Sequence, residues 1–197
     1  MPCQAPYVTG ADVQGGGSGV GIDSLQAGLW VPAGAPGGAQ TNFVLPTPNI
    51  VYAMRFVCPK ALTISKIVFS VATLAAVNDP CDAGIYSADG AVLLGSAGST
   101  LGKLNAALGP QTLTMQAPIS LAKDTIYYAA WGIGTIGGAA AAIICTTMPY
   151  YMTTPFGAAL GQAEQIGRSG AGNFPLSAPF GTFSTITNSV PIMALVT

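Results

Sequence analysis

Short runs of alternating apolar and polar residues cover most of the chain from position 41 onward. In residues 51–57, Tyr52, Met54 and Phe56 fall on one face of an extended strand. Residues 126–133 form an aromatic-rich apolar run of strand length. No stretch shows a sustained apolar stripe at helical spacing with helix caps. The pattern predicts about eight short strands in an all-β domain.

Two local features refine this prediction. In residues 62–71 the apolar phase slips around Lys66, which predicts a β-bulge. Residues 82–94 form a predicted hairpin whose Asp89-Gly90 pair supplies the positive φ of a tight turn. Residues 149–189, punctuated by four prolines, are predicted to be loop-like. Further strands are expected at 112–116, at 139–146 as the partner of 126–133, and at 190–197.

The first 42 residues differ from the rest of the chain. Residues 15–21 have the composition of a flexible linker. Short apolar segments, which include Leu29, Trp30 and Val31, are scattered among Gly and Pro. Such a stretch cannot build a core of its own. We therefore expect an N-terminal attachment arm over 1–42 that docks on a neighbour through these three residues, and a β-sandwich domain over 43–197.

Charge is scarce enough to exclude several classes of protein. The chain has 197 residues, six Lys and Arg, seven Asp and Glu and no His, for a net charge of -1. Six scattered cations cannot neutralise a nucleic-acid backbone, and without His there is no Ser-His-Asp triad or His-ligated metal site. A neutral surface also promotes association, which favours an assembly over a free monomer.

The cysteines and the longest uncharged stretch call for two further interpretations. Cys3, Cys58, Cys81 and Cys145 match no zinc or redox spacing, and the chain opens without a secretory signal, so free thiols and synthesis in a reducing cytoplasm are expected. Residues 126–145 are apolar enough to be weighed as a membrane span. Their Gly-rich middle favours a strand, a loop and a second strand instead.

The candidate chemistry is sparse. Asp79, Asp82 and Asp89 would suit a calcium or sugar-hydroxyl site, but their Asn-Asp-Pro setting favours turns. Glu164 and Arg168 are spaced to pair on one helical turn, which we favour over catalysis. We therefore expect no catalytic, cofactor-binding or metal-binding residues. Five aromatic residues are candidates for stacking on sugar rings, although core packing is the commoner role: Tyr127, Tyr128, Trp131, Tyr150 and Tyr151.

A family resemblance adds a functional expectation. Its first segment is Tyr52-x-x-x-Phe56-x-x-Pro59-x-x-Leu62-Thr63-Ile64-Ser65-Lys66-Ile67, and its second is Gly84-Ile85-Tyr86-Ser87-Ala88-Asp89-Gly90. Leu121-x-x-Asp124-Thr125-x-Tyr127-Tyr128-x-Ala130, Phe174-Pro175-Leu176 and Pro191-Ile192-Met193-Ala194-Leu195 follow. The order of these segments, over roughly 43–197, resembles the jelly-roll domains of tailed-bacteriophage virion proteins, which include head decoration proteins, head fibres and tail fibres.

The resemblance implies a jelly-roll-like antiparallel β-sandwich, a trimeric state and an N-terminal attachment segment. It brings no catalytic residues. The resulting hypothesis is a non-enzymatic virion structural protein, a decoration or cement protein or a short head fibre on the capsid exterior. It would be assembled in the host cytoplasm, and its partners would be its own copies and the major capsid protein, with no nucleic acid and no membrane.

An alternative hypothesis is a tail-fibre module that binds a host surface glycan through exposed Tyr, Trp and Asp side chains. In either case, two stretches are candidates for surfaces hidden in the assembly. The first 49 residues contain no Lys or Arg, and residues 125–163 contain no charge.

Overall fold

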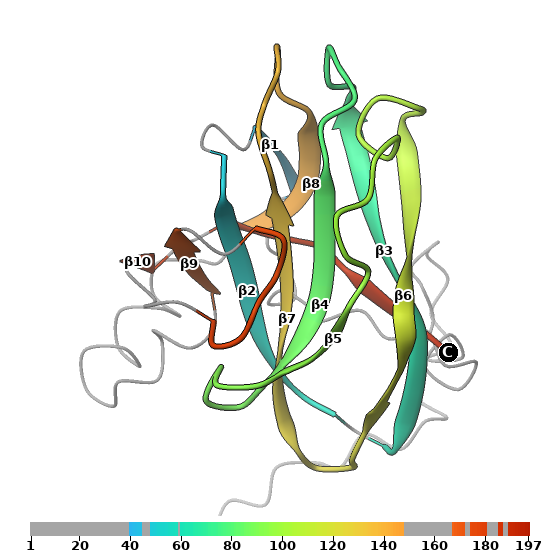
Figure 1. The fold of residues 1–197 in the computed structure, drawn as a ribbon, viewed down its shortest axis with the longest axis vertical. Helices are drawn as coiled ribbons and strands as arrows, with labels where there is room; N and C mark the ends of the chain where they lie inside the picture. Colours follow the sequence, from blue (N-terminus) through green and yellow to red (C-terminus); the bar gives the residue numbers. More distant parts are fainter. Residues whose placement is uncertain are drawn as a thin grey trace, which may run out of the picture.

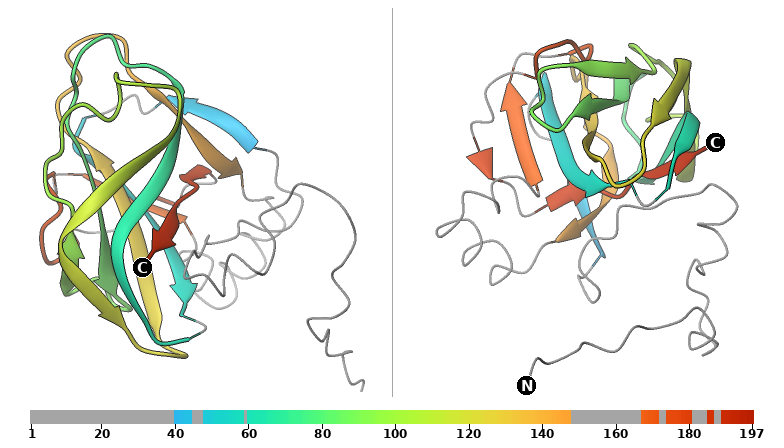
Figure 2. Two further views of the ribbon diagram at one scale, coloured as in Figure 1. Left: turned by 90° about the vertical axis from the view of Figure 1, so that its right-hand side faces the viewer. Right: turned by 90° about the horizontal axis from the view of Figure 1, so that it is seen from below.

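The described part of the chain consists of strands and loops only. The computed structural model describes residues 40–44, 48–58, 60–147, 167–171, 174–180, 185–186 and 189–197. These hold twelve strands and no helix, arranged in two antiparallel sheets that pack face to face (Figures 1 and 2). The prediction of an all-β sandwich is confirmed.

Each sheet draws its strands from distant parts of the sequence. Sheet A contains β1 (Gln40–Val44), β3 (Leu62–Thr73), β6 (Gly109–Leu121), β8 (Ala142–Thr147), β11 (Ser189–Pro191) and β12 (Ala194–Val196). Sheet B has the order β10 (Thr185–Ile186), β9 (Gly167–Ala171), β2 (Ile50–Val57), β7 (Ile126–Ile133), β4 (Cys81–Ser87) and β5 (Leu93–Ser96). Between β2 and β8, every connection except the β4–β5 hairpin crosses from one sheet to the other. These crossover connections cover both ends of the sandwich.

Sheet A contains a fork. Strands β3 and β8 pair only near Val71 and Thr73, and beyond this point they diverge. The C-terminal segment enters the gap, where β11 pairs with β8 and β12 pairs with β3. Met193 and Leu195 of this segment are fully buried in the main core.

The main core lies between the sheets and follows from the alternation seen in the sequence. On β3, Ile64, Ile67, Phe69 and Val71 point inward, and the break in this alternation coincides with a register shift between Ile64 and Lys66. The predicted bulge is therefore confirmed. Phe69 packs against Trp131 of β7 with a ring-centroid distance of 5.6 Å.

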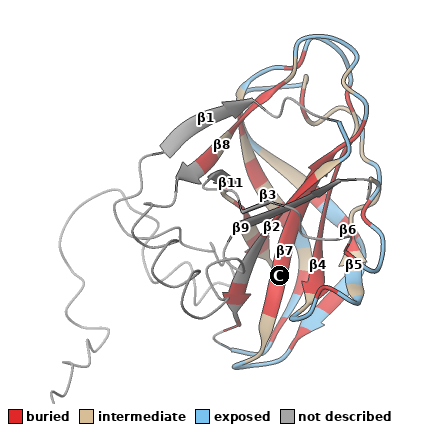
Figure 3. Ribbon diagram, turned by 90° about the vertical axis from the view of Figure 1, so that its left-hand side faces the viewer, coloured by how far each residue is buried: buried red, intermediate tan, exposed pale blue. Residues whose placement is uncertain are grey.

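Strand β7 is buried on both faces, and β4 is buried along nearly its whole length (Figure 3). The outer face of sheet B is covered by residues 174–180, which we call the strap. Leu176 and Phe180 of the strap pack with Tyr86 and Tyr128 in a second, smaller core cluster. This second layer explains why β7 is a continuous apolar run rather than an alternating one.

Several predicted elements are confirmed. Strand β7 spans 126–133 as expected, β2 covers 51–57, and β6 contains 112–116. The predicted hairpin over 82–94 is the β4–β5 hairpin, and Gly90 has a φ of 72° at its turn.

Other predictions are wrong in detail. Strand β8 does not pair with β7; it lies in the opposite sheet, because the Gly-rich segment between them is a crossover rather than a hairpin turn. Within the predicted loop region, Gly167–Ala171 forms β9 against β2, and Arg168 lies on this strand rather than on a helical turn. The last strand is split into β11 and β12. Strand β1 begins at Gln40, just before the predicted domain boundary at 42.

The uncharged stretch that begins at residue 125 has an explanation within the fold. Its first part is β7, which is buried inside this one chain, so this part needs no partner to hide it. Within the described part of the chain, no helix qualifies as a membrane-spanning segment. The strand, loop and strand favoured for 126–145 are confirmed.

Candidate functional site

Three crossover loops meet at one end of the sandwich. They are residues 74–80, 97–108 and 134–141, and we call them together the loop end (top of Figure 1). The 74–80 loop is central, because its main chain is hydrogen-bonded to both of the others. Ala75 N donates to Leu104 O and Ala76 N donates to Ala139 O, each at 2.9 Å.

Side chains and close packing complete the loop end. Asn78 and Asp79 accept hydrogen bonds from the backbone N–H groups of Gly102 and Gly137, the second at 2.8 Å. A Cβ on Gly137 would lie 2.8 Å from Val77 Cγ2, so this position requires glycine unless Val77 moves. Leu104 points inward and caps the core. The loop end is therefore a tightly connected surface.

The outer surface of the loop end is apolar. Leu101 and Leu108 expose 58% and 62% of their surface, and Leu74 and Val77 are also exposed. These four are among the six large hydrophobic residues that are exposed in the described part of the chain. The loop end holds two charged side chains, of which Lys103 is half-buried and Asp79 is buried. A concentration of exposed aliphatic residues of this kind is typical of an interaction site.

The opposite end of the sandwich carries four exposed charged side chains. The turns after β2, β4 and β6 form it, and we call it the charged end (bottom of Figure 1). Lys60, Asp89, Lys123 and Asp124 are all exposed on these turns. Lys123 and Asp124 form an exposed ion pair at 3.7 Å. The molecule therefore presents an apolar end and a charged end.

The structure separates the three clustered aspartates. Asp89 is exposed in the β4–β5 turn, where its Oδ1 accepts hydrogen bonds from the Ser87 hydroxyl and the Ala91 N–H. The Ser87 hydrogen bond, the larger influence, and the Ala91 bond lower the pKa of Asp89. Asp79 joins two loops of the loop end, because its Oδ1 accepts a hydrogen bond from the Gly137 N–H. Among the described residues, no three His, Cys, Asp or Glu side chains form a group able to hold a metal ion.

Asp82 has a structural role that the sequence pattern did not indicate. It is fully buried on β4, and its Oδ2 accepts a hydrogen bond from the N–H of Leu176 at 3.0 Å. Burial raises the pKa of Asp82, and its hydrogen bonds oppose this effect. Tyr86, on the same strand, donates its hydroxyl to Ser177 O at 2.8 Å. Asp82 and Tyr86 thus fasten the strap to sheet B.

The thiols belong to the interior. Cys58, Cys81 and Cys145 are free and buried, whereas Cys3 lies outside the described residues. Burial raises the pKa of Cys81 and Cys145 to about 12, and it also raises the pKa of Cys58. A thiol that keeps its proton in this way is a poor nucleophile at neutral pH.

The aromatic candidates for sugar stacking are core residues where the structure describes them. Tyr127, Tyr128 and Trp131 are buried, so they offer no face to a ligand. Tyr150 and Tyr151 lie outside the described residues, as do Glu164 and the predicted interface residues Leu29, Trp30 and Val31.

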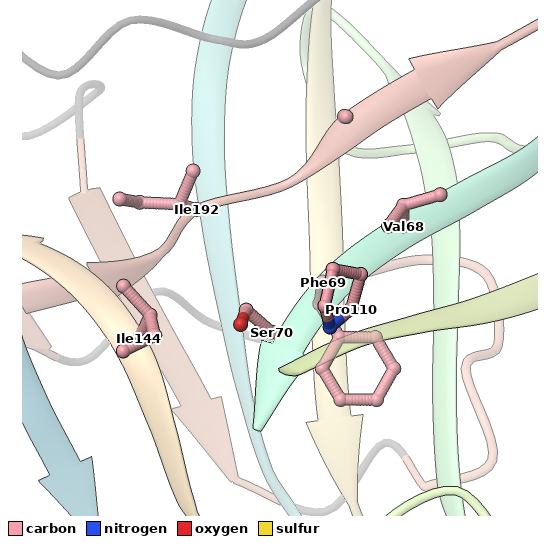
Figure 4. A pocket seen from close by; sticks show the side chains of 7 residues that line it. Val68, Phe69, Ser70, Pro110, Ile144 and Ile192 are labelled. Carbon is pink, nitrogen blue, oxygen red and sulfur yellow. The ribbon is translucent and has the colours of Figure 1, made fainter. Parts of the chain in front are cut away.

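A shallow groove marks the fork in sheet A (Figure 4). It has a volume of about 400 Å³, and the Ser70 side chain supplies the hydroxyl in an otherwise largely apolar lining. Its lining residues come from β3, β6, β8 and the C-terminal segment: Val68, Phe69, Ser70, Pro110, Ile144, Ile192 and Ala194. No charged residue lines it, so it offers shape and apolar contact only.

Sequence reasoning did not single out the apolar residues of the loop end. A signal was present, because Leu101 and Leu108 each precede a glycine and Val77 precedes Asn-Asp-Pro. Aliphatic residues beside turn formers are not explained by strand alternation. No protein-family model matches the chain, and no curated protein matches it either.

Proposed function

We propose that this protein is a non-enzymatic structural protein of a virion, a decoration or cement protein or a short head fibre on the capsid exterior. The observation that supports the proposal best is the segregation of exposed side chains. Four of the six exposed large aliphatic residues of the described chain lie on the loop end, whereas the charged end carries four exposed charged residues beside the exposed Val92. Such a molecule buries one end against a partner and keeps the other in water.

The resemblance to the jelly-roll domains of tailed-bacteriophage virion proteins supplies the virion context and the finer fold assignment. In this proposal, apolar burial between copies of the chain in a trimer, and against the major capsid protein, drives assembly. The described titratable groups suit a structural role, because Asp79 and Asp82 accept hydrogen bonds that hold loops and the strap in place.

The proposal is tested by the native mass of the purified chain and by its copy number in purified particles. We expect a stable oligomer, with a trimer favoured, and many copies in each particle. A stable monomer that is absent from particles contradicts the proposal. Binding to a glycan array by a protein present in few copies would instead favour the glycan-binding alternative.

A further inference from the structure

The loop end is an unpartnered apolar surface, and the chain itself contains a segment that matches it. Leu74, Val77, Leu101 and Leu108 are exposed on the loop end, which also carries the half-buried Lys103. Residues 22–31, which lie outside the described part of the chain, read Ile-Asp-Ser-Leu-Gln-Ala-Gly-Leu-Trp-Val. We propose that this segment of one copy docks on the loop end of a neighbouring copy, an inference that rests on the proposed assembly role.

The chemistry of the two surfaces is complementary. The segment carries five large apolar residues and a single charge, the carboxylate of Asp23. The loop end exposes four large aliphatic side chains, and its one cationic side chain, Lys103, is half-buried. An aromatic anchor such as Trp30 on an aliphatic surface is a common centre of binding energy, and one opposite-charge pair at the rim orients the segment.

The direction of β1 favours a neighbouring copy over the same copy. Val44 pairs with Ala142, which directly follows the 134–141 loop, whereas Gln40 pairs with Thr146 farther along β8. The chain therefore enters β1 at the end that lies away from the loop end of its own copy. Eight residues, 32–39, lie between Val31 and Gln40, and the nine steps from Val31 to Gln40 reach about 30 Å when extended.

A zero-length carbodiimide crosslink between carboxylate and amine tests the proposed pairing in the unmodified full-length chain. Equal amounts of unlabelled and 15N-labelled protein are mixed, crosslinked and analysed by mass spectrometry. We expect an Asp23–Lys103 crosslink that joins labelled to unlabelled chains. Crosslinks confined to one copy, or an equal yield from Asp23 to Lys60, Lys66 and Lys123, overturn the proposal.

Variants of the full-length chain provide a second measurement, the dissociation constant of self-association by sedimentation. Leu101→Asp should weaken association at least tenfold. The matched control is Val92→Asp, because Val92 is 53% exposed but lies at the charged end, and it should change association less than about twofold. Lys103→Asp should also weaken association, and Asp23→Lys in the same chain should restore it.

The two measurements separate this inference from the proposed function. If the wild-type chain associates but neither the crosslink nor the Leu101→Asp effect is found, the assembly role stands and the docking of residues 22–31 is wrong. If the wild-type chain is monomeric and gives no crosslink between copies, the docking of residues 22–31 is wrong, and the proposed function is wrong as well if the chain is absent from purified particles. Circular dichroism and thermal unfolding of each variant confirm that the sandwich has folded.

Discussion

Single buried polar residues in this protein hold separate segments of the chain together through hydrogen bonds. Asp82 is fully buried, and its carboxylate receives the N–H of Leu176 from the strap. Asp82→Ala leaves this donor without a partner, and we expect a loss of about 1–3 kcal/mol in the free energy of unfolding. Urea denaturation measures it. Asp89→Ala is the control, since Asp89 makes its hydrogen bonds in an exposed turn, and an equal loss in both variants would contradict the assigned role.

The buried thiols give stability a dependence on alkaline pH. Cys81 and Cys145 have pKa values of about 12 in the folded state against an ordinary value of 9.0. The folded state therefore holds these protons more tightly, so stability is fully present below pH 9 and is lost as the pH rises toward 12. The slope is up to about 1.4 kcal/mol per pH unit for each thiol.

This dependence is measured by urea denaturation between pH 8 and pH 10. The variant Cys81→Ala with Cys145→Ala should show a flatter decline than the wild type, because two of the titrating groups are gone. Tyr52, whose pKa is raised to about 12, contributes in the same direction above pH 10, so the lower part of the range is the informative one. An unchanged slope would mean that the thiols do not carry the effect.

At the scale of elements, the strap covers the outer face of sheet B, so this sheet is buried on both faces where the strap lies. Leu176 and Phe180 are buried against the outer face of this sheet, whereas the Ser177 side chain is exposed. Leu176→Ala should cost about 2–5 kcal/mol and Phe180→Ala about 3–5 kcal/mol in the free energy of unfolding. Ser177→Ala is the control within the strap, and its effect should stay below about 0.5 kcal/mol.

Hydrogen exchange distinguishes local from global effects of these strap variants. If the strap is a separate layer, Leu176→Ala should speed exchange of the Phe180 N–H, which is bonded to Gly90 O, more than that of amides in β3. Uniform acceleration throughout the sandwich would show that the strap and the main core unfold as one unit.

The strands were largely predictable from sequence, but their assignment to sheets was not. Alternation located β2 and β6, and the phase slip at Lys66 located the bulge, because burial of one face imposes a period of two. Pairing depends on contacts between distant residues. The Gly-rich link after Ile133 looks the same whether it turns back beside β7 or crosses to the other sheet. Asp82 resembled a turn residue because its partner, Leu176, is 94 positions away.

At the scale of the whole molecule, the driving force for association should be apolar rather than electrostatic. The loop end exposes four aliphatic residues, and its one cation, Lys103, is half-buried, so there is little exposed charge for NaCl to screen. We expect the dissociation constant of self-association to change less than about threefold between 0.05 and 0.5 M NaCl. Sulfate salts, which are excluded from apolar surface, should strengthen association instead. Sedimentation in both salts tests this, and a steep NaCl dependence would point to the charged end as the interface.

The connections within the loop end have a consequence for how this protein can change over evolutionary time. Its three loops are joined mainly through main-chain atoms, with Asn78 and Asp79 as the contributing side chains. Leu74, Leu101 and Leu108 take no part in these hydrogen bonds. Substitutions at these positions therefore leave the hydrogen bonds between the loops intact. Proteins that share this sandwich can therefore differ at these three positions, and bind different partners, while they keep the same fold.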